Sequence, residues 1–134
     1  MYVEYNPNPA GRSVGDCAVR AVAKALDVDW ESAYAMISLN GFLMSDMPSS
    51  NSTWGATLKQ NGFYMKSVPN NYPQDYTAKD FCREHKNGVY VLGFGNHVAT
   101  AIDGKLFDSW DSSNEILMYV WYKKGNPPFI GDDT

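Results

Sequence analysis

The sequence predicts an α+β fold in which N-terminal helices pack on a C-terminal antiparallel sheet. Three observations predict this class. Apolar residues recur at helical spacing near the N-terminus, β-branched and aromatic residues are concentrated after residue 88, and Asp103-Gly104 between two apolar runs is a strong hairpin signal. Because 134 residues is the usual length of one domain, we expect a single domain over 1–134, with a tail over 125–134.

The expected helices and strands follow in order along the chain. Apolar side chains at helical spacing start a first helix near Cys17, with Ser13 or Asp16 available as its cap. Asn40-Gly41 is a stop signal for a second helix, and residues 77–80 resemble a capping box. These signals predict helices over 17–26, 29–40, 54–61 and 77–86, strands over 63–68, 89–94, 97–102, 105–107 and 116–122, and a loop over 41–53.

Composition and charge narrow the class of partner. The formal net charge of -4 and the absence of a Lys/Arg cluster argue against nucleic acid, whose affinity comes largely from neutralised phosphates. The first ten residues lack the basic start and apolar run of a secretory signal, and no segment has membrane-spanning length. We therefore expect a cytoplasmic protein with no membrane or nucleic-acid partner, in which the two cysteines, Cys17 and Cys82, are free thiols.

Three residues far apart in the sequence form a candidate catalytic group. Cys17 stands at a predicted helix start, where the positive end of the helix dipole favours the thiolate. His97 opens a predicted strand and has the side chain that can take a proton from a thiol. The hairpin at Asp103-Gly104 returns the next strand to His97, where Asp108 is available to accept the second ring N–H.

The hairpin register leaves two aspartates as partners for His97. A turn centred between Asp103 and Gly104 places His97 opposite position 110, within about two positions. Asp108 and Asp111 are both in this range. We favour Asp108 because it directly follows an apolar strand, whereas Asp111 begins a segment rich in turn-forming residues.

These residues lie in motifs that resemble those of papain-like cysteine peptidases. Asn96-His97-Val98-Ala99 resembles the histidine motif of that superfamily, and Asp108-Ser109-Trp110 resembles its Asn-Ser-Trp element, with Asp in place of Asn. Gly15-Asp16-Cys17-Ala18 is similar to the nucleophile motif of its bacterial branches, including the leader peptidase domains of bacteriocin exporters. The order Cys, His, Asp is also that of the superfamily, and the short chain resembles compact members from bacteria and their phages.

The resemblance implies a papain-like fold and an activity. Cys17 would be the nucleophile, His97 the general base and acid, and Asp108 the orienting residue of a peptidase, isopeptidase or amidase that works through a thioester. Such acyl chemistry needs no cofactor, and the partner that the resemblance implies is a peptide or protein substrate. The same three residues are also compatible with transglutaminase or acyltransferase chemistry, and with an inactive peptide-binding module of the same fold.

One position departs from the pattern of the superfamily. Papain-like enzymes usually place a Gln six residues before the cysteine as an oxyanion donor, and this chain has Gly11 there. The backbone N–H of Cys17 would then need a second donor, for which Asn8, Arg12 and Ser13 are candidates. Loss of one such donor typically lowers the rate by ~10²–10³. Gly11 is therefore the main argument for the inactive alternative.

The remaining polar and aromatic residues receive simpler interpretations. Asn96 and Trp110 are expected to line the site, with Trp110 shielding His97 and its acid partner or only packing there. Arg20, one turn after Cys17, is in a position to steady a carboxylate or to line the cleft, but we expect a solvated helix residue. Trp30, Tyr34 and Ile37 are expected in the core. Cys82 and His85 have a spacing compatible with two metal ligands, but a structural zinc site usually has four, so we expect no metal.

Overall fold

The computed structural model describes residues 1–129. Within them the chain forms an α+β fold of four helices and a six-stranded sheet, as the class prediction required. The helices are α1 (Cys17–Leu26), α2 (Trp30–Met44), α3 (Asn51–Gln60) and α4 (Ala78–Glu84). The strands are β1 (Tyr2–Glu4), β2 (Phe63–Ser67), β3 (Val89–Gly93), β4 (Val98–Ile102), β5 (Lys105–Asp108) and β6 (Tyr119–Lys123).

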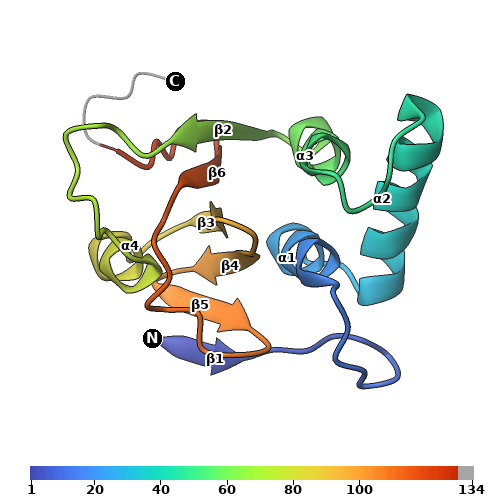
Figure 1. Ribbon diagram of the computed structural model, residues 1–134, viewed down its shortest axis with the longest axis horizontal. Helices are drawn as coiled ribbons and strands as arrows, with labels where there is room; N and C mark the ends of the chain where they lie inside the picture. The colour runs from blue at the N-terminus through green and yellow to red at the C-terminus, as the bar shows by residue number, and fades with distance from the viewer. Residues whose placement is uncertain (130–134) are drawn as a thin grey trace.

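The sheet is mixed, which corrects the prediction of an antiparallel sheet at the C-terminal end. Its strand order is β1-β5-β4-β3-β6-β2, and β1 pairs with β5 in parallel while the other neighbours are antiparallel. Strand β1, which the sequence did not predict, forms one edge, and β2, from between two helices, forms the other (Figure 1). Each of the central strands β4 and β3 is therefore hydrogen-bonded to a neighbouring strand along both of its edges.

Helices cover both faces of the sheet. Figure 1 shows α1, α2 and α3 on one side and α4 on the other. Residues of β3 alternate between the two layers: Val91 joins the core with α1 to α3, and Leu92 joins the core with α4. Each layer buries large apolar side chains, such as Ile37 and Phe81. The sheet is thus packed between two hydrophobic cores, one on each face.

The hairpin that brings His97 and Asp108 together has the predicted register. Strand β4 pairs with β5 through Ile102 with Lys105 and Thr100 with Phe107. Asp103 and Gly104 both have positive φ, 52° and 80°, as the favoured two-residue hairpin turn requires. The capping box at the start of α4 is also confirmed.

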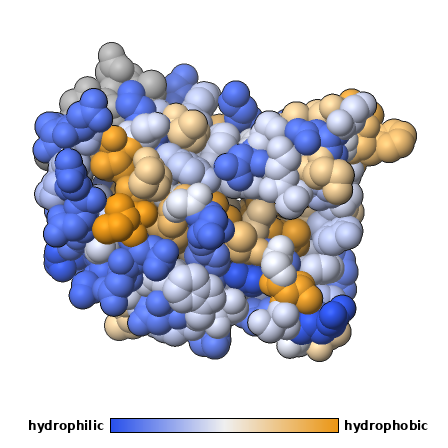
Figure 2. Space-filling view, viewed as in Figure 1, coloured by the Kyte–Doolittle hydropathy of each residue, from blue (hydrophilic) through white to orange (hydrophobic). Residues whose placement is uncertain are grey.

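Two boundaries of the helical half differ from the prediction. Helix α2 does not stop at Asn40-Gly41, because both residues serve packing: the buried Asn40 amide donates to Thr57 Oγ1 at 2.7 Å, and a Cβ on Gly41 would lie 2.8 Å from the Asp46 carbonyl oxygen. The expected loop over 41–53 is therefore reduced to residues 45–50, between α2 and α3. The extra turn of α2 exposes Phe42 and its apolar neighbours at the far end of that helix (Figure 2).

The last elements also differ in part. Strand β6 begins at Tyr119 and not at Ile116, because Ile116 bridges Thr77 before α4. Helix α4 ends at Glu84, two residues before the predicted end at Lys86. Of the expected tail over 125–134, residues 130–134 lie outside the described part, whereas Phe129 is buried against Tyr72, with ring centroids 5.1 Å apart.

Candidate active site

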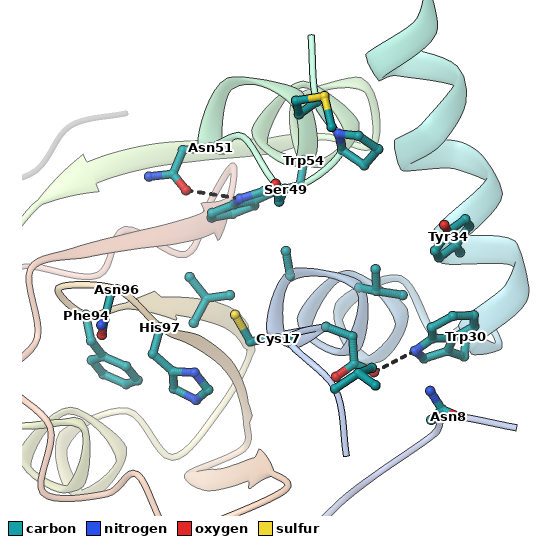
Figure 3. Close-up of a pocket in the computed structure, with 18 of the residues that line it drawn as sticks. Asn8, Cys17, Trp30, Tyr34, Ser49, Asn51, Trp54, Phe94, Asn96 and His97 are labelled. Carbon is teal, nitrogen blue, oxygen red and sulfur yellow. Dashed lines mark hydrogen bonds between the residues drawn. The ribbon is translucent and has the colours of Figure 1, made fainter. Parts of the chain in front are cut away.

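A cleft of about 680 Å³ lies between the start of α1 and the turn from β3 to β4. Figure 3 shows Cys17 from α1 and His97 from that turn next to each other in this cleft, with Trp30 and Tyr34 of α2 at one end and Trp54 of α3 along a wall. The cleft therefore meets the sheet where β3 and β4 are joined. It contains the residues that the sequence predicted as nucleophile and base.

Cys17 is the first residue of α1, as predicted. The His97 side chain and the backbone N–H of Val98 both favour the thiolate form of Cys17. Partial burial raises the pKa of Cys17, but these two groups and the charges of His97 and Arg20 outweigh burial. The pKa of Cys17 is thus lower than its ordinary value, which increases the fraction present as thiolate.

His97 bridges Cys17 and Asp108. Its Nε2 donates to Asp108 Oδ2 at 2.6 Å, which leaves Nδ1 as the ring nitrogen for the Cys17 sulfur. Burial lowers the pKa of His97, but the hydrogen bonds and charges of Asp108 and Cys17 prevail and raise it to about 9. The Trp110 ring lies against the imidazole, with centroids 4.8 Å apart, and partly covers it. Asp108 and Cys17 therefore both favour the protonated form of the imidazole.

Asp108 ends β5 and is only 1 % exposed. Besides His97, it accepts hydrogen bonds from Ser112 Oγ at 2.6 Å and from the Ser109 N–H at 2.7 Å. Burial raises the pKa of Asp108, yet the bonds from His97 and Ser112 keep it below its ordinary value. Asp111, the other candidate, is exposed and accepts from the Ser113 N–H in its own turn. The structure thus joins His97 to Asp108, as the sequence analysis favoured.

Arg20 and Asp16 form a second polar layer behind these residues. Arg20 is 7 % exposed, so the expectation of a solvated helix residue was wrong. Its Nη2 donates to Asp108 Oδ1 at 3.3 Å, and its Nη1 donates to Asp16 Oδ1. Trp30 Nε1 donates to Asp16 Oδ2 at 2.9 Å. A chain of buried polar contacts therefore runs from Trp30 to His97.

Asp16 occupies the N-cap position of α1 without capping it. Its carboxylate makes no hydrogen bond to the first turn of the helix, because Arg20 and Trp30 hold it elsewhere. The cleft-lining residues Cys17, Ala18 and Val19 form this first turn. Backbone N–H groups at a helix start favour negative charge nearby.

The three predicted oxyanion donors do not all line the cleft. Asn8 and Arg12 line the cleft, but Ser13 does not. Figure 3 shows Asn8 toward Trp30 and away from Cys17 and His97. Asn8 Oδ1 accepts the Ala10 and Arg12 N–H groups at 2.9 and 3.3 Å, closing a turn in which Gly11 has a φ of +65°. This geometry explains the glycine, because that φ favours a residue without Cβ.

We compared the chain with known proteins. No family model, curated protein or solved structure gives a significant match. Its function is therefore inferred from the geometry of the cleft.

The cleft also contains aromatic residues that the sequence analysis predicted to lie in the core. Trp30 and Tyr34 were expected in the core, but both line the cleft, stacked with ring centroids 5.0 Å apart. Only Ile37 of that predicted group is a core residue. Asn96 lines the cleft as expected, and Trp110 lies outside the lining while contacting His97. An apolar helix does not itself reveal which of its faces is buried.

Among residues 1–129, no three His, Cys, Asp or Glu side chains are grouped so that they could hold a metal ion. Within the same residues, no helix combines the length and apolar character needed to cross a membrane.

Proposed function

We propose that this chain is a papain-like cysteine hydrolase that cleaves a peptide, isopeptide or other amide through a thioester on Cys17. One observation carries the proposal: Cys17 and His97 line the same cleft, and His97 Nε2 is hydrogen-bonded to Asp108 Oδ2 at 2.6 Å. A thiol at a helix start, a base in contact with it and an acid that orients the base are the parts that thiol acyl transfer needs.

The proposed reaction has two stages. In the first, the Cys17 thiolate bonds to the substrate carbonyl carbon, and His97 gives its proton to the amine as the C–N bond breaks. In the second, His97 takes a proton from water as the water oxygen attacks the thioester carbon, the C–S bond breaks, and the acid product leaves with the Cys17 thiolate and the protonated His97 restored. Asp108 keeps Nε2 occupied throughout, so Nδ1 is the nitrogen that transfers protons.

The tetrahedral intermediates carry negative charge on the former carbonyl oxygen. We propose that the uncapped first turn of α1 stabilises this charge, with the Cys17 N–H as one donor. Gly11 supplies no side chain for a second donor, and Asn8 lies toward Trp30. Backbone donors of the helix start would therefore have the role that a Gln side chain has in papain-like enzymes.

The substrate proposed for this site is a peptide or protein segment. The cleft combines aromatic surface from Trp30, Tyr34 and Trp54 with polar groups such as Asn96 at its edges, a mixture typical of peptide-binding sites. We propose that the protein acts in a cytoplasm, where a reducing environment keeps both thiols free.

A digest of unrelated proteins, incubated with the purified chain and with Cys17→Ala, tests the proposal. Mass spectrometry should detect new peptide termini with the wild type only. Products joined to an added primary amine would favour the transferase alternative. If neither reaction occurs and Cys17→Ala binds the same peptides as the wild type, the inactive binding module is correct and the proposed hydrolase is rejected.

A further inference from the structure

Arg20 lies at the junction between the two halves of the site. Cys17 belongs to the helical layer, whereas His97 and Asp108 belong to the sheet. Arg20, on the same helix as Cys17, is the residue that donates to carboxylates on both sides: Asp16 before α1 and Asp108 at the end of β5. We infer that Arg20 is a positioning residue that fixes the start of α1 relative to β5, so that the Cys17 sulfur and the His97 ring face each other.

Burial supports this role. Arg20, Asp16 and Asp108 are 7 %, 7 % and 1 % exposed, so water does not screen their charges effectively. A buried carboxylate left without its cationic partner is strongly destabilised, and it tends to move or take up a proton. The guanidinium satisfies both carboxylates from one rigid plane, which a lysine ammonium does not do.

The hydrogen bonds to the two carboxylate oxygens of Asp108 also support the positioning role of Arg20. Oδ2 is shared by His97 and Ser112, and Oδ1 by Arg20 and the Ser109 N–H. A carboxylate held at both oxygens has little freedom to rotate. Arg20 thus holds the far oxygen of Asp108 while His97 uses the near one.

The charged and titratable groups around Arg20 come from several elements. Asp16 and Cys17 belong to the start of α1, Asp108 to β5, and Tyr5 to the segment after β1. The Arg20 charge favours the Cys17 thiolate. Removal of Arg20 should therefore slow thiolate chemistry at neutral pH even if the protein stays folded.

This inference rests on the proposed function only for its kinetic test, because iodoacetamide alkylation of Cys17 reports the thiolate without any substrate. We would compare Arg20→Met and Arg20→Lys with Arg83→Met as the control. Arg83 forms a similar helix ion pair with Asp80, but it is exposed on α4, on the other side of the sheet. Each variant is measured for unfolding, for Cys17 alkylation against pH, and for kcat and KM.

Arg20→Met should alkylate at least ~5-fold more slowly at pH 7 and lose ~10²-fold in kcat, with KM within ~3-fold, because misplaced reacting groups affect the chemical step. Arg20→Lys should recover most of the alkylation rate but stay ~10-fold low in kcat, since the charge returns without the planar fork. Arg83→Met should match the wild type in both.

A purely structural role predicts another result. Arg20→Met would then unfold more easily, while its folded molecules kept wild-type alkylation and kcat, and this outcome overturns the inference. If Arg20→Met does not fold, Arg20→Lys decides: wild-type kcat rejects the proposed role, and a selective loss of kcat supports it. If the wild type cleaves nothing while Arg20→Met still slows alkylation, the proposed hydrolase is wrong and the positioning role stands.

Discussion

Two Cys-His pairs occur in this molecule, and only one forms a candidate reactive site. Cys17 and His97 are distant in sequence, line the same cleft, and have Asp108 as a third residue, which is hydrogen-bonded to His97. Cys82 and His85 are close in sequence on and just after α4, but Cys82 is buried in the core and burial raises its pKa. The two thiols therefore have opposite pKa shifts.

The two histidines differ in the same way. His97 has a carboxylate on one ring nitrogen and a thiol for the other. The ring nitrogens of His85 instead lie 2.8 Å from the Phe81 carbonyl oxygen and 2.5 Å from that of Pro128, and its ring stacks on Phe81. Residue type and spacing do not separate the pairs. Surroundings do, because Cys17 and His97 line the same cleft, whereas His85 lines a different pocket and Cys82 is buried in the core.

The largest effect expected from this comparison concerns the two cysteines. Cys17→Ala should lower kcat by at least ~10³-fold with unchanged stability, because the thiol supplies the nucleophile and contributes little packing. Cys82→Ala should keep kcat and lose stability, since it empties a buried volume. Steady-state kinetics and denaturant unfolding of both variants measure this. Retained activity in Cys17→Ala together with its loss in Cys82→Ala would reverse the assignment.

Asp108 should show the next largest effect. Asp108→Ala should lower kcat by at least ~10²-fold, with a smaller loss for Asp108→Asn, because an amide oxygen still accepts the ring N–H but does not offset the imidazolium charge. Asp111→Ala is the matched control. Its exposed carboxylate accepts the Ser113 N–H in its own turn and is not bonded to His97, so kcat should stay within a few-fold of wild type. The reverse ranking would contradict the geometry seen here.

The pH dependence of kcat/KM should show whether His97 is the group that donates a proton. The pKa of His97 is raised to about 9, so the imidazolium that donates to the leaving amine is lost as pH rises through that value. We expect kcat/KM to fall above about pH 9, whereas Cys17 alkylation does not fall, because the thiolate persists. Because the folded protein raises the pKa of His97, protonation of His97 stabilises the fold. This contribution to the free energy of unfolding is complete below about pH 6.5 and is lost as the pH rises through about 9. A rate that keeps rising beyond pH 10 would exclude His97 as the acid.

The smallest kinetic effect is expected at the second histidine. His85→Gln should leave kcat within ~2-fold and reduce the free energy of unfolding by ~1–2 kcal/mol, because the lost contacts hold α4 to the Pro128 segment. Thermal or denaturant unfolding measures the loss. A large fall in kcat with unchanged stability would show that the two Cys-His pairs are coupled.

Local signals predicted the parts of the fold that position His97 and Asp108. The Asp103-Gly104 turn fixed the β4–β5 register because its two positive φ angles suit those residue types. The apolar spacing after Cys17 placed α1 with its observed ends. The sequence therefore located all three residues that the structure brings together.

Features set by distant contacts were not predictable. Strand β1 spans three residues, and its pairing with β5 gives it structure that no local pattern announces. Arg20 resembled a solvated arginine because its burial depends on Asp108, far away in the chain. The Ser112 contact with Asp108 depends likewise on the loop after β5. The contacts of Arg20 and Ser112 with Asp108 can therefore be identified only from the folded structure.

The burial of Cys82 also has a practical consequence for measuring this protein. Native molecules present one accessible thiol, Cys17, and the unfolded chain presents both. A chromogenic disulfide reagent should therefore release one equivalent of dye from intact protein, and a second equivalent only after denaturant is added. The ratio of the two steps gives the fraction of folded molecules in a preparation, an internal titration that requires neither a substrate nor a mutation.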